Sequence, residues 1–391
     1  MEFRFASRLD DFGEGIFTTL NDLKNKMIEE GKTVYNLSVG TPDFEPSKVA
    51  MEAVVQAAGK PENYKYALAD LPELIEAVIR RFQKRYGVEL KEQEVTSVYG
   101  SQEGITHIGL ALCNPGDIVL VPNPGYPIFS IGPALAGAKV VEYPLLKEKE
   151  YLPDLESIPE DVKQRAKFMI VSYPANPVCA TAPGSFYEEL VAFAKKYNIF
   201  IVHDNAYSDI VYNGKQGISF LSIPGAKDVG VEFYSLSKSY NLTGCRVSFL
   251  VGNEKMIQAM KTIRSQIDYG TFLPVQYGAI AALNEPDDAI IKQCEIYEER
   301  MKTLCGGLRS IGWEVPDSKG SMFVWLPLPE GHTNSAEFAL ELAKKSGVLC
   351  TPGSSFGSLG EGYVRMALVL PAEEIKEAVR AIAESGMIKN K

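Results

Sequence analysis

The chain has 391 residues, of which 46% are hydrophobic and 23% charged, a balance that excludes a disordered or fibrous protein. A single compact core commonly spans ~100 to 200 residues, so this length predicts two lobes. Acidic residues outnumber basic ones by 50 to 40, and the resulting net charge of -10 argues against nucleic acid as a partner.

The cysteines and the N-terminal residues indicate a reducing compartment. No Cys-x-x-Cys pair occurs among the six cysteines, which are too widely spaced for a disulfide scaffold, so we expect free thiols. Charges run through the first eleven residues, unlike a signal peptide, and no segment approaches the ~20 apolar residues of a membrane span. We therefore expect a cytoplasmic protein that does not bind membranes.

Between about residues 95 and 255, short β-branched runs alternate with helical stretches, the pattern of a parallel sheet covered by helices. The predicted strands are 94–99, 117–122, 139–143, 168–172, 199–203, 231–235 and 247–251. The sequence thus predicts an α/β fold with a mostly parallel seven-stranded sheet sandwiched by helices.

The C-terminal third mixes helices with a few strands, which predicts a smaller α+β domain. The expected helices are 255–267, 275–283, 286–311, 335–346 and 371–385, and the expected strands are 322–326 and 363–367. No linker divides the chain, so the lobes must share segments. We assign 1–45 to an N-terminal arm and part of the small domain, 46–283 to the large domain, and 284–391 to the small C-terminal domain.

Polar side chains follow five of the predicted strands. They include Ser101 and Gln102, Tyr126, Asn176, Asp204 and Tyr207, and finally Ser235, Ser237 and Lys238. Ligands of open parallel sheets bind at the carboxyl ends of the strands. This edge of the sheet is therefore the expected site.

Two of these clusters have a direct chemical interpretation. Gly100-Ser101-Gln102 begins a helix, where backbone N–H groups can bind a phosphate, although for this turn on its own plain helix capping is the favoured interpretation. The second cluster carries more weight, because Lys238 stands with two serine hydroxyls and Arg246 within twelve residues after an apolar strand. Asp204 by itself could be a turn residue, and any single tyrosine could belong to the core.

The spacing of these residues resembles that of the class I/II aminotransferases of the fold-type I pyridoxal-phosphate superfamily. Asn176 precedes Asp204 by 28 residues, Asp204 precedes Tyr207 by 3, and Lys238 precedes Arg246 by 8 and Arg365 by 127. The similarity runs from Leu37-Ser38-Val39-Gly40-Thr41-Pro42-Asp43 to Gly362-Tyr363-Val364-Arg365-Met366. Such an ordered set seldom arises by chance.

The resemblance implies a role for each catalytic residue. Lys238 would hold pyridoxal 5′-phosphate as a Schiff base and then move the proton between the substrate and the cofactor. Asp204 would keep the pyridine nitrogen protonated, since a carboxylate favours the nearby cation. Tyr207 and Asn176 would hydrogen-bond the phenolic oxygen of the ring, and Tyr126 would stack on its face.

The resemblance also implies how the phosphate and the substrate are bound. The phosphate would be held by Ser101, Gln102, Ser235, Ser237 and Arg246. The substrate would be bound by Arg365, which clamps its α-carboxylate, by Gly40, which allows close backbone approach, and by Asn176.

The stretch 64–74 resembles the segment that gives the neighbouring subunit a tyrosine for its phosphate, but it is one residue shorter and lacks the usual glycine. Both Tyr64 and Tyr66 are eligible, and we favour Tyr66 of the partner subunit. A borrowed tyrosine requires a C₂ homodimer with shared active sites. The segment 15–32 would then be a helical arm that covers the site or crosses to the other subunit.

Three local departures from the family pattern are visible. The family's Asn-Pro-Thr-Gly turn reads Asn176-Pro177-Val178-Cys179, and Asn205 replaces an acidic residue after Asp204. The segment 265–270 carries Gln266 and Tyr269 where the relatives have a polar loop with an asparagine, so the distal pocket could accept another side chain.

The histidines predict little chemistry. His107 could support Asp204 from behind, but a packed histidine is the simpler interpretation, and His203 should point to the opposite face of its strand. Three scattered histidines without paired spacing predict no metal site.

The resemblance implies ping-pong transamination, in which an L-amino acid passes its nitrogen to the cofactor and a 2-oxo acid takes it away. The main rival is a carbon-sulfur β-lyase of the cystathionine type, which would use the same site for elimination. A binding module without activity is disfavoured, because Lys238, Asp204 and Arg365 are all present. The stretches 16–40 and 203–208 most resemble the LL-diaminopimelate aminotransferases and their relatives.

Overall fold

The computed structural model describes residues 3–9 and 16–388, and it divides into two compact units. The large unit comprises residues 41–296 and 319–321, and the small unit comprises, of the described residues, 3–9, 16–40, 297–318 and 322–388. We placed the divisions at 45 and 283 from the sequence. The second change of unit instead falls inside helix α12 (Asp288–Ser310), because packing rather than a helix end separates the units there.

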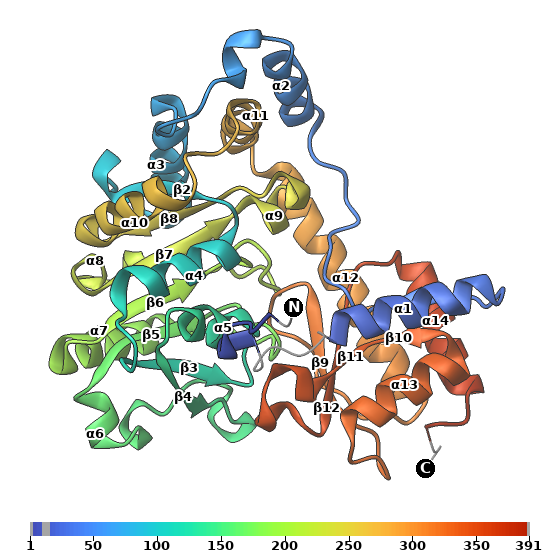
Figure 1. Ribbon diagram of the computed structural model, residues 1–391. Coiled ribbons are helices and arrows are strands. Elements are labelled where there is room, and N and C mark those ends of the chain that lie inside the picture. Colours follow the sequence, from blue (N-terminus) through green and yellow to red (C-terminus); the bar gives the residue numbers. More distant parts are fainter. Residues whose placement is uncertain (1–2, 10–15, 389–391) are drawn as a thin grey trace. The chain divides into compact units, whose positions relative to one another are not determined.

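The large unit is built on a seven-stranded sheet with the order β2-β8-β7-β6-β5-β3-β4 (Figure 1). Its strands are β2 Val95–Val98, β3 Ile118–Asn123, β4 Lys139–Pro144, β5 Ala166–Ser172, β6 Phe200–Asp204, β7 Gly230–Ser235 and β8 Ser248–Gly252. Only β8 runs antiparallel to its neighbours β2 and β7. The predicted mostly parallel sheet is confirmed, and each strand ends within two residues of its predicted bounds.

Helices cover the sheet of the large unit. They are α2 Lys48–Ala58, α3 Pro72–Tyr86, α4 Ser101–Leu112, α5 Ile128–Leu135, α6 Glu160–Lys163, α7 Gly184–Tyr197, α8 Ala226–Val229, α9 Leu236–Ser239, α10 Glu254–Ile267 and α11 Leu273–Asn284. Side chains from α4, α5 and α10 form one core with alternate residues of the strands, such as Ile170 and Phe233, which are fully buried. Apolar side chains therefore fill the space between these three helices and the sheet.

The small unit is α+β, as predicted. A three-stranded antiparallel sheet has the order β11 (Thr351–Pro352), β12 (Tyr363–Ala367) and β9 (Phe323–Pro327). A second pair joins β1 (Tyr35–Asn36) to β10 (Val348–Leu349) in parallel. The remaining helices are α1 Ile16–Glu29, α13 Ser335–Ser346 and α14 Ala372–Glu384. Of the expected arm 15–32, Gly15 lies outside the described residues.

All six cysteines are free thiols, as the sequence predicts. Within residues 3–9 and 16–388, no helix combines the length and the apolar character needed to cross a membrane.

Candidate active site

Lys238 lies on α9, the short helix that directly follows β7. The hydroxyl of Ser235 caps this helix by accepting the N–H of Ser237 at 3.2 Å, and it also accepts the hydroxyl of Ser248 at 2.9 Å. At the other end, the carbonyl of Lys238 accepts a hydrogen bond of 2.8 Å from Nε2 of Gln293. The backbone that carries the lysine is thus fixed on both sides.

The strand register brings the predicted residues to one edge of the sheet. Ser172, Asp204 and Phe233 are cross-strand neighbours on β5, β6 and β7, so the loops that follow these strands begin side by side. Those loops carry Asn176, which is buried, Tyr207, which is also buried, and Lys238.

A second register adds the phosphate residues to the same edge. Ser248 on β8 pairs with Ser235 on one side and with Val98 on the other. Val98 ends β2 just before the turn that starts α4 at Ser101. The same end of the three neighbouring strands β2, β8 and β7 therefore carries Arg246, Ser101 and Ser235.

Asp204 is the last residue of β6 and only 7% exposed. Burial raises the pKa of this carboxyl to about 6, and the neighbouring His203 opposes the shift. Among the residues described, Oδ1 of Asp204 has no hydrogen-bond partner. A buried polar atom without a partner costs ~1 to 3 kcal/mol, which is a reason to expect that a bound group completes it.

Arg246 lies at the start of α4. Its guanidinium contacts Gly100 so closely that no β-carbon would fit there, and it donates to the carbonyls of Thr243 at 3.1 Å and Tyr99 at 3.3 Å. Its own backbone is left-handed, with φ of 52°, a strained conformation that costs of order 1 kcal/mol outside glycine. The buried hydroxyl of Ser101 has no partner among the described residues. A cation, a helix N-terminus and an unsatisfied hydroxyl together suit a phosphate.

Gln102 and Tyr126 stand beside this turn. Gln102 is exposed, and its Oε1 accepts the Tyr126 hydroxyl at 3.5 Å. Tyr126 itself is half-buried after β3, with its ring edge-to-face against Phe129. The turn after β5 keeps a left-handed residue where the family has glycine, since Cys179 has φ of 57°.

The two predicted substrate residues of the small unit lie together around one ring. Gly40 contacts Phe323 so closely that a β-carbon would clash with the ring. The guanidinium of Arg365 lies 4.0 Å from the centroid of that ring and 4.7 Å from the centroid of Phe356. Arg365 is 2% exposed and donates to the carbonyl of Ser38 at 3.1 Å.

His107 is buried, as the simpler interpretation of a packed histidine expects. Its Nδ1 lies 2.5 Å from Oε1 of Glu103, one helical turn earlier. Glu103, His107 and Asp268 form a group that could hold a metal ion by geometry alone, but Arg264 approaches both carboxylates, at 2.7 Å for Asp268 and 3.9 Å for Glu103. The positive charge of Arg264 therefore lies beside both carboxylates, where a metal ion would have to bind.

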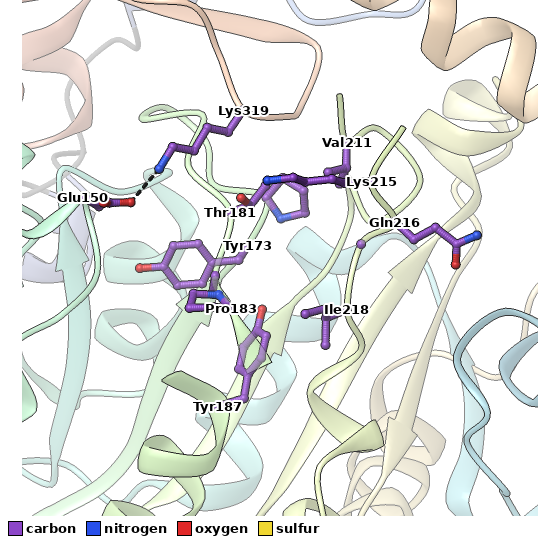
Figure 2. A pocket seen from close by; sticks show the side chains of 13 residues that line it. Glu150, Tyr173, Thr181, Pro183, Tyr187, Val211, Lys215, Gln216, Ile218 and Lys319 are labelled. Carbon is purple, nitrogen blue, oxygen red and sulfur yellow. Dashed lines mark hydrogen bonds and ion pairs between the residues drawn. The ribbon is translucent and has the colours of Figure 1, made fainter. Parts of the chain in front are cut away.

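The partners of His203 were not predicted from the sequence. The side chain of His203 lies on the face of β6 opposite to Asp204, where Nδ1 bonds Glu232 at 2.9 Å and Nε2 bonds Tyr187 at 3.2 Å. Tyr187 and Tyr173 also line a cavity of about 310 Å³. Glu150 and Lys319, which form an ion pair of 2.6 Å, line the same cavity. Figure 2 shows these four side chains around it. None of the predicted site residues lines this cavity.

Comparisons with known proteins agree with this geometry. The family model of aminotransferase class I and II matches residues 32–382. The chain belongs to the class I and II aminotransferases. The LL-diaminopimelate aminotransferases of Aquifex aeolicus and Dehalococcoides mccartyi (strain BAV1) are 42% and 41% identical, over 97% of this chain and 98% of theirs.

Solved structures give the same result. The substrate-bound BacF structure from Bacillus subtilis has a TM-score of 0.96 at 35% identity and covers 100% of both chains. A probable N-succinyldiaminopimelate aminotransferase from Thermus thermophilus has a TM-score of 0.90 at 34% identity, over 95% of this chain and 100% of the other. The alternative of a β-lyase finds no support among these relatives.

The protein is therefore a pyridoxal-phosphate-dependent aminotransferase. The residues present fit that cofactor. Its protonated ring nitrogen suits the unpartnered oxygen of Asp204, and its phosphate suits Arg246 and the hydroxyl of Ser101. Lys238 follows β7, which lies between the strands that lead to these two groups.

The raised pKa of Asp204 predicts that the free energy of unfolding of the cofactor-free protein depends on pH. Between the ordinary carboxyl pKa near 4 and the folded value of about 6, the folded state holds a proton that the unfolded state lacks, so stability falls as the pH rises through this window. Asp204→Asn removes the effect. Its free energy of unfolding, relative to wild type, should rise by roughly 3 kcal/mol between about pH 4 and about pH 7.

Urea unfolding of both proteins without cofactor measures this difference. Parallel pH profiles for wild type and variant would show that ionisation of Asp204 does not lower the stability of the folded protein.

Proposed function

We propose that this aminotransferase takes LL-diaminopimelate as its amino donor and 2-oxoglutarate as its acceptor. The observation that carries the proposal is the 41 to 42% identity to LL-diaminopimelate aminotransferases across nearly the whole chain. The departures at Gln266 and Tyr269 concern only the distal pocket, where both side chains are exposed.

The cofactor, when bound, supplies an electron sink next to the substrate α-carbon. We propose that Asp204 provides the negative charge that keeps the ring nitrogen protonated. Its buried position makes this interaction strong, because a carboxylate in a low-dielectric site gains most from a directly opposed cation. Asn176 and Tyr207 would donate hydrogen bonds to the ring oxygen from the two neighbouring loops.

Lys238 would move the proton. The backbone of its helix is held by hydrogen bonds at Ser235 and Gln293, so we expect the amine to move on its flexible side chain while the surrounding fold stays in place. Ser101, Gln102, Ser235, Ser237 and Arg246 would hold the phosphate throughout, so that the cofactor stays in place when the lysine is released.

We propose Arg365 as the clamp for the substrate α-carboxylate, with Gly40 and Asn176 as the other substrate contacts. The guanidinium is buried between two aromatic rings and bonded to neutral oxygen atoms. Such packing fixes the planar fork, and a planar fork matches a carboxylate in two parallel hydrogen bonds.

We further propose a cytoplasmic homodimer in which Tyr66 reaches the phosphate of the partner subunit. Tyr64 already donates its hydroxyl to the carbonyl of Ala58 at 2.9 Å, whereas the side chain of Tyr66 is 79% exposed beside Tyr269. Leu68 is also 75% exposed. An exposed apolar group of this kind suits a surface buried by a second copy.

A screen of amino donors tests the substrate. With 2-oxoglutarate as acceptor, LL-diaminopimelate should give the highest kcat/KM among LL-diaminopimelate, aspartate, N-succinyl-diaminopimelate, phenylalanine and leucine. Lys238→Ala serves as the inactive control. A higher kcat/KM with an aromatic or aliphatic donor would overturn the substrate assignment and leave the aminotransferase intact.

A pair of tyrosine variants tests the shared site. Tyr66→Phe should weaken pyridoxal-phosphate binding about tenfold, because a hydroxyl bonded to a charged phosphate contributes ~1.5 to 3 kcal/mol. Tyr64→Phe is the matched control and should bind like wild type. Titration of cofactor-free protein gives the affinity, and sedimentation should give a dimer of twice 43.0 kDa. A monomer, or equal affinity for the two variants, contradicts the proposal.

A further inference from the structure

A buried cluster of charges lies beneath the loop that carries Tyr207. Its centre is Asp209, whose Oδ1 accepts Nη2 of Arg81 at 3.1 Å and Nε of Arg85 at 3.0 Å. Both arginines come from α3. The side chains of Arg81 and Asp209 are 2% and 1% exposed.

Burial acts to raise the pKa of Asp209, but the two guanidinium groups outweigh it and hold this pKa below its ordinary value. The aspartate is therefore charged. Arg81 also pairs with Asp287 at 2.5 Å, and Nζ of Lys84 lies 3.2 Å from the other oxygen of Asp287, so three cations face two carboxylates in this cluster.

Arg81 reaches both chain segments that bear the proposed catalytic residues. Through Asp209 it fixes the loop two residues after Tyr207, where the N–H of Ile210 also closes a turn on the carbonyl of Tyr207 at 2.9 Å. Nε of Arg81 donates at 3.1 Å to the hydroxyl of Tyr234, and that hydroxyl donates at 3.2 Å to Oδ2 of Asp209.

The second of these segments carries Lys238, and Arg81 contacts a tyrosine on each side of this lysine. Tyr234 immediately precedes Ser235, the cap of the helix that carries Lys238. Tyr240 follows Lys238 by two residues, and its ring centroid lies 5.9 Å from the guanidinium carbon of Arg81.

We propose that Arg81 is a positioning residue of the cofactor site, which sets the spacing between Tyr207 and Lys238 through Asp209 and Tyr234. The inference rests on the roles proposed above for those two residues.

The deciding variant is Tyr234→Phe. It removes only the hydroxyl through which Tyr234 bonds both Arg81 and Asp209, it leaves their direct ion pair in place, and it keeps the ring that packs edge-to-face on Phe82. Asp209→Asn removes the negative charge of the ion pair, and Arg81→Lys keeps the positive charge but removes the fork that bonds Asp209, Asp287 and Tyr234 together. Arg80→Lys is the matched control, because Arg80 lies next in α3 but is 57% exposed and forms its ion pair with Glu76 at the surface.

Three measurements separate position from stability: the thermal unfolding of the cofactor-free protein, the dissociation constant of pyridoxal phosphate, and the pH midpoint of the bound cofactor's visible absorbance. We expect Tyr234→Phe to unfold within a few degrees of wild type, to bind the cofactor about tenfold more weakly, and to shift the absorbance midpoint. Arg80→Lys should match wild type in all three.

An unchanged cofactor affinity and an unchanged absorbance midpoint in Tyr234→Phe would overturn the inference, whatever happens to the unfolding temperature. If Asp209→Asn or Arg81→Lys fails to fold, Tyr234→Phe still decides. Wild-type protein that binds no pyridoxal phosphate would refute the residue roles proposed above, which is a different result from a variant that behaves like wild type.

Discussion

The carboxylate of Asp204 sits at the buried end of β6 with one oxygen that meets no donor among the described residues. Leaving such a group unsatisfied costs free energy, and burial raises its pKa toward 6. The buried hydroxyl of Ser101 also lacks a hydrogen-bond partner among the described residues and carries a similar free-energy cost. We propose that the ring nitrogen and the phosphate of one cofactor satisfy these two atoms, and that the bound cofactor thereby stabilises the folded chain.

The sheet makes this arrangement possible because two registers end at the same edge. The parallel neighbours β5, β6 and β7 end side by side, so the loop of Asn176, the end of β6 at Asp204 and the short helix of Lys238 begin at the same edge. The antiparallel β8 then links β7 to β2 and brings Arg246 to the start of α4. A parallel strand in the place of β8 would reverse that connection and carry Arg246 to the opposite edge of the sheet.

Much of this was predictable from the sequence, since continuous apolar strands and the polar residues after them are local signals. The seven strands and the polar strand ends follow from such patterns. The partners of His107 and of Asp209 do not. Arg81 and Asp209 are 128 residues apart, and only the packing of α3 against the loop after β6 joins them. Nor does a cysteine signal a left-handed turn, yet Cys179 adopts one without the glycine of the family. The change of unit within α12 likewise depends on packing, because the helix itself has no break there.

A crystal structure of the protein with pyridoxal phosphate would test the central claim most directly. We predict that the ring nitrogen lies within ~3 Å of the Asp204 carboxylate, that Nζ of Lys238 is joined to the cofactor, and that the phosphate contacts Arg246 and Ser101. A cofactor bound with its ring nitrogen away from Asp204, or with its phosphate away from the start of α4, would contradict the account.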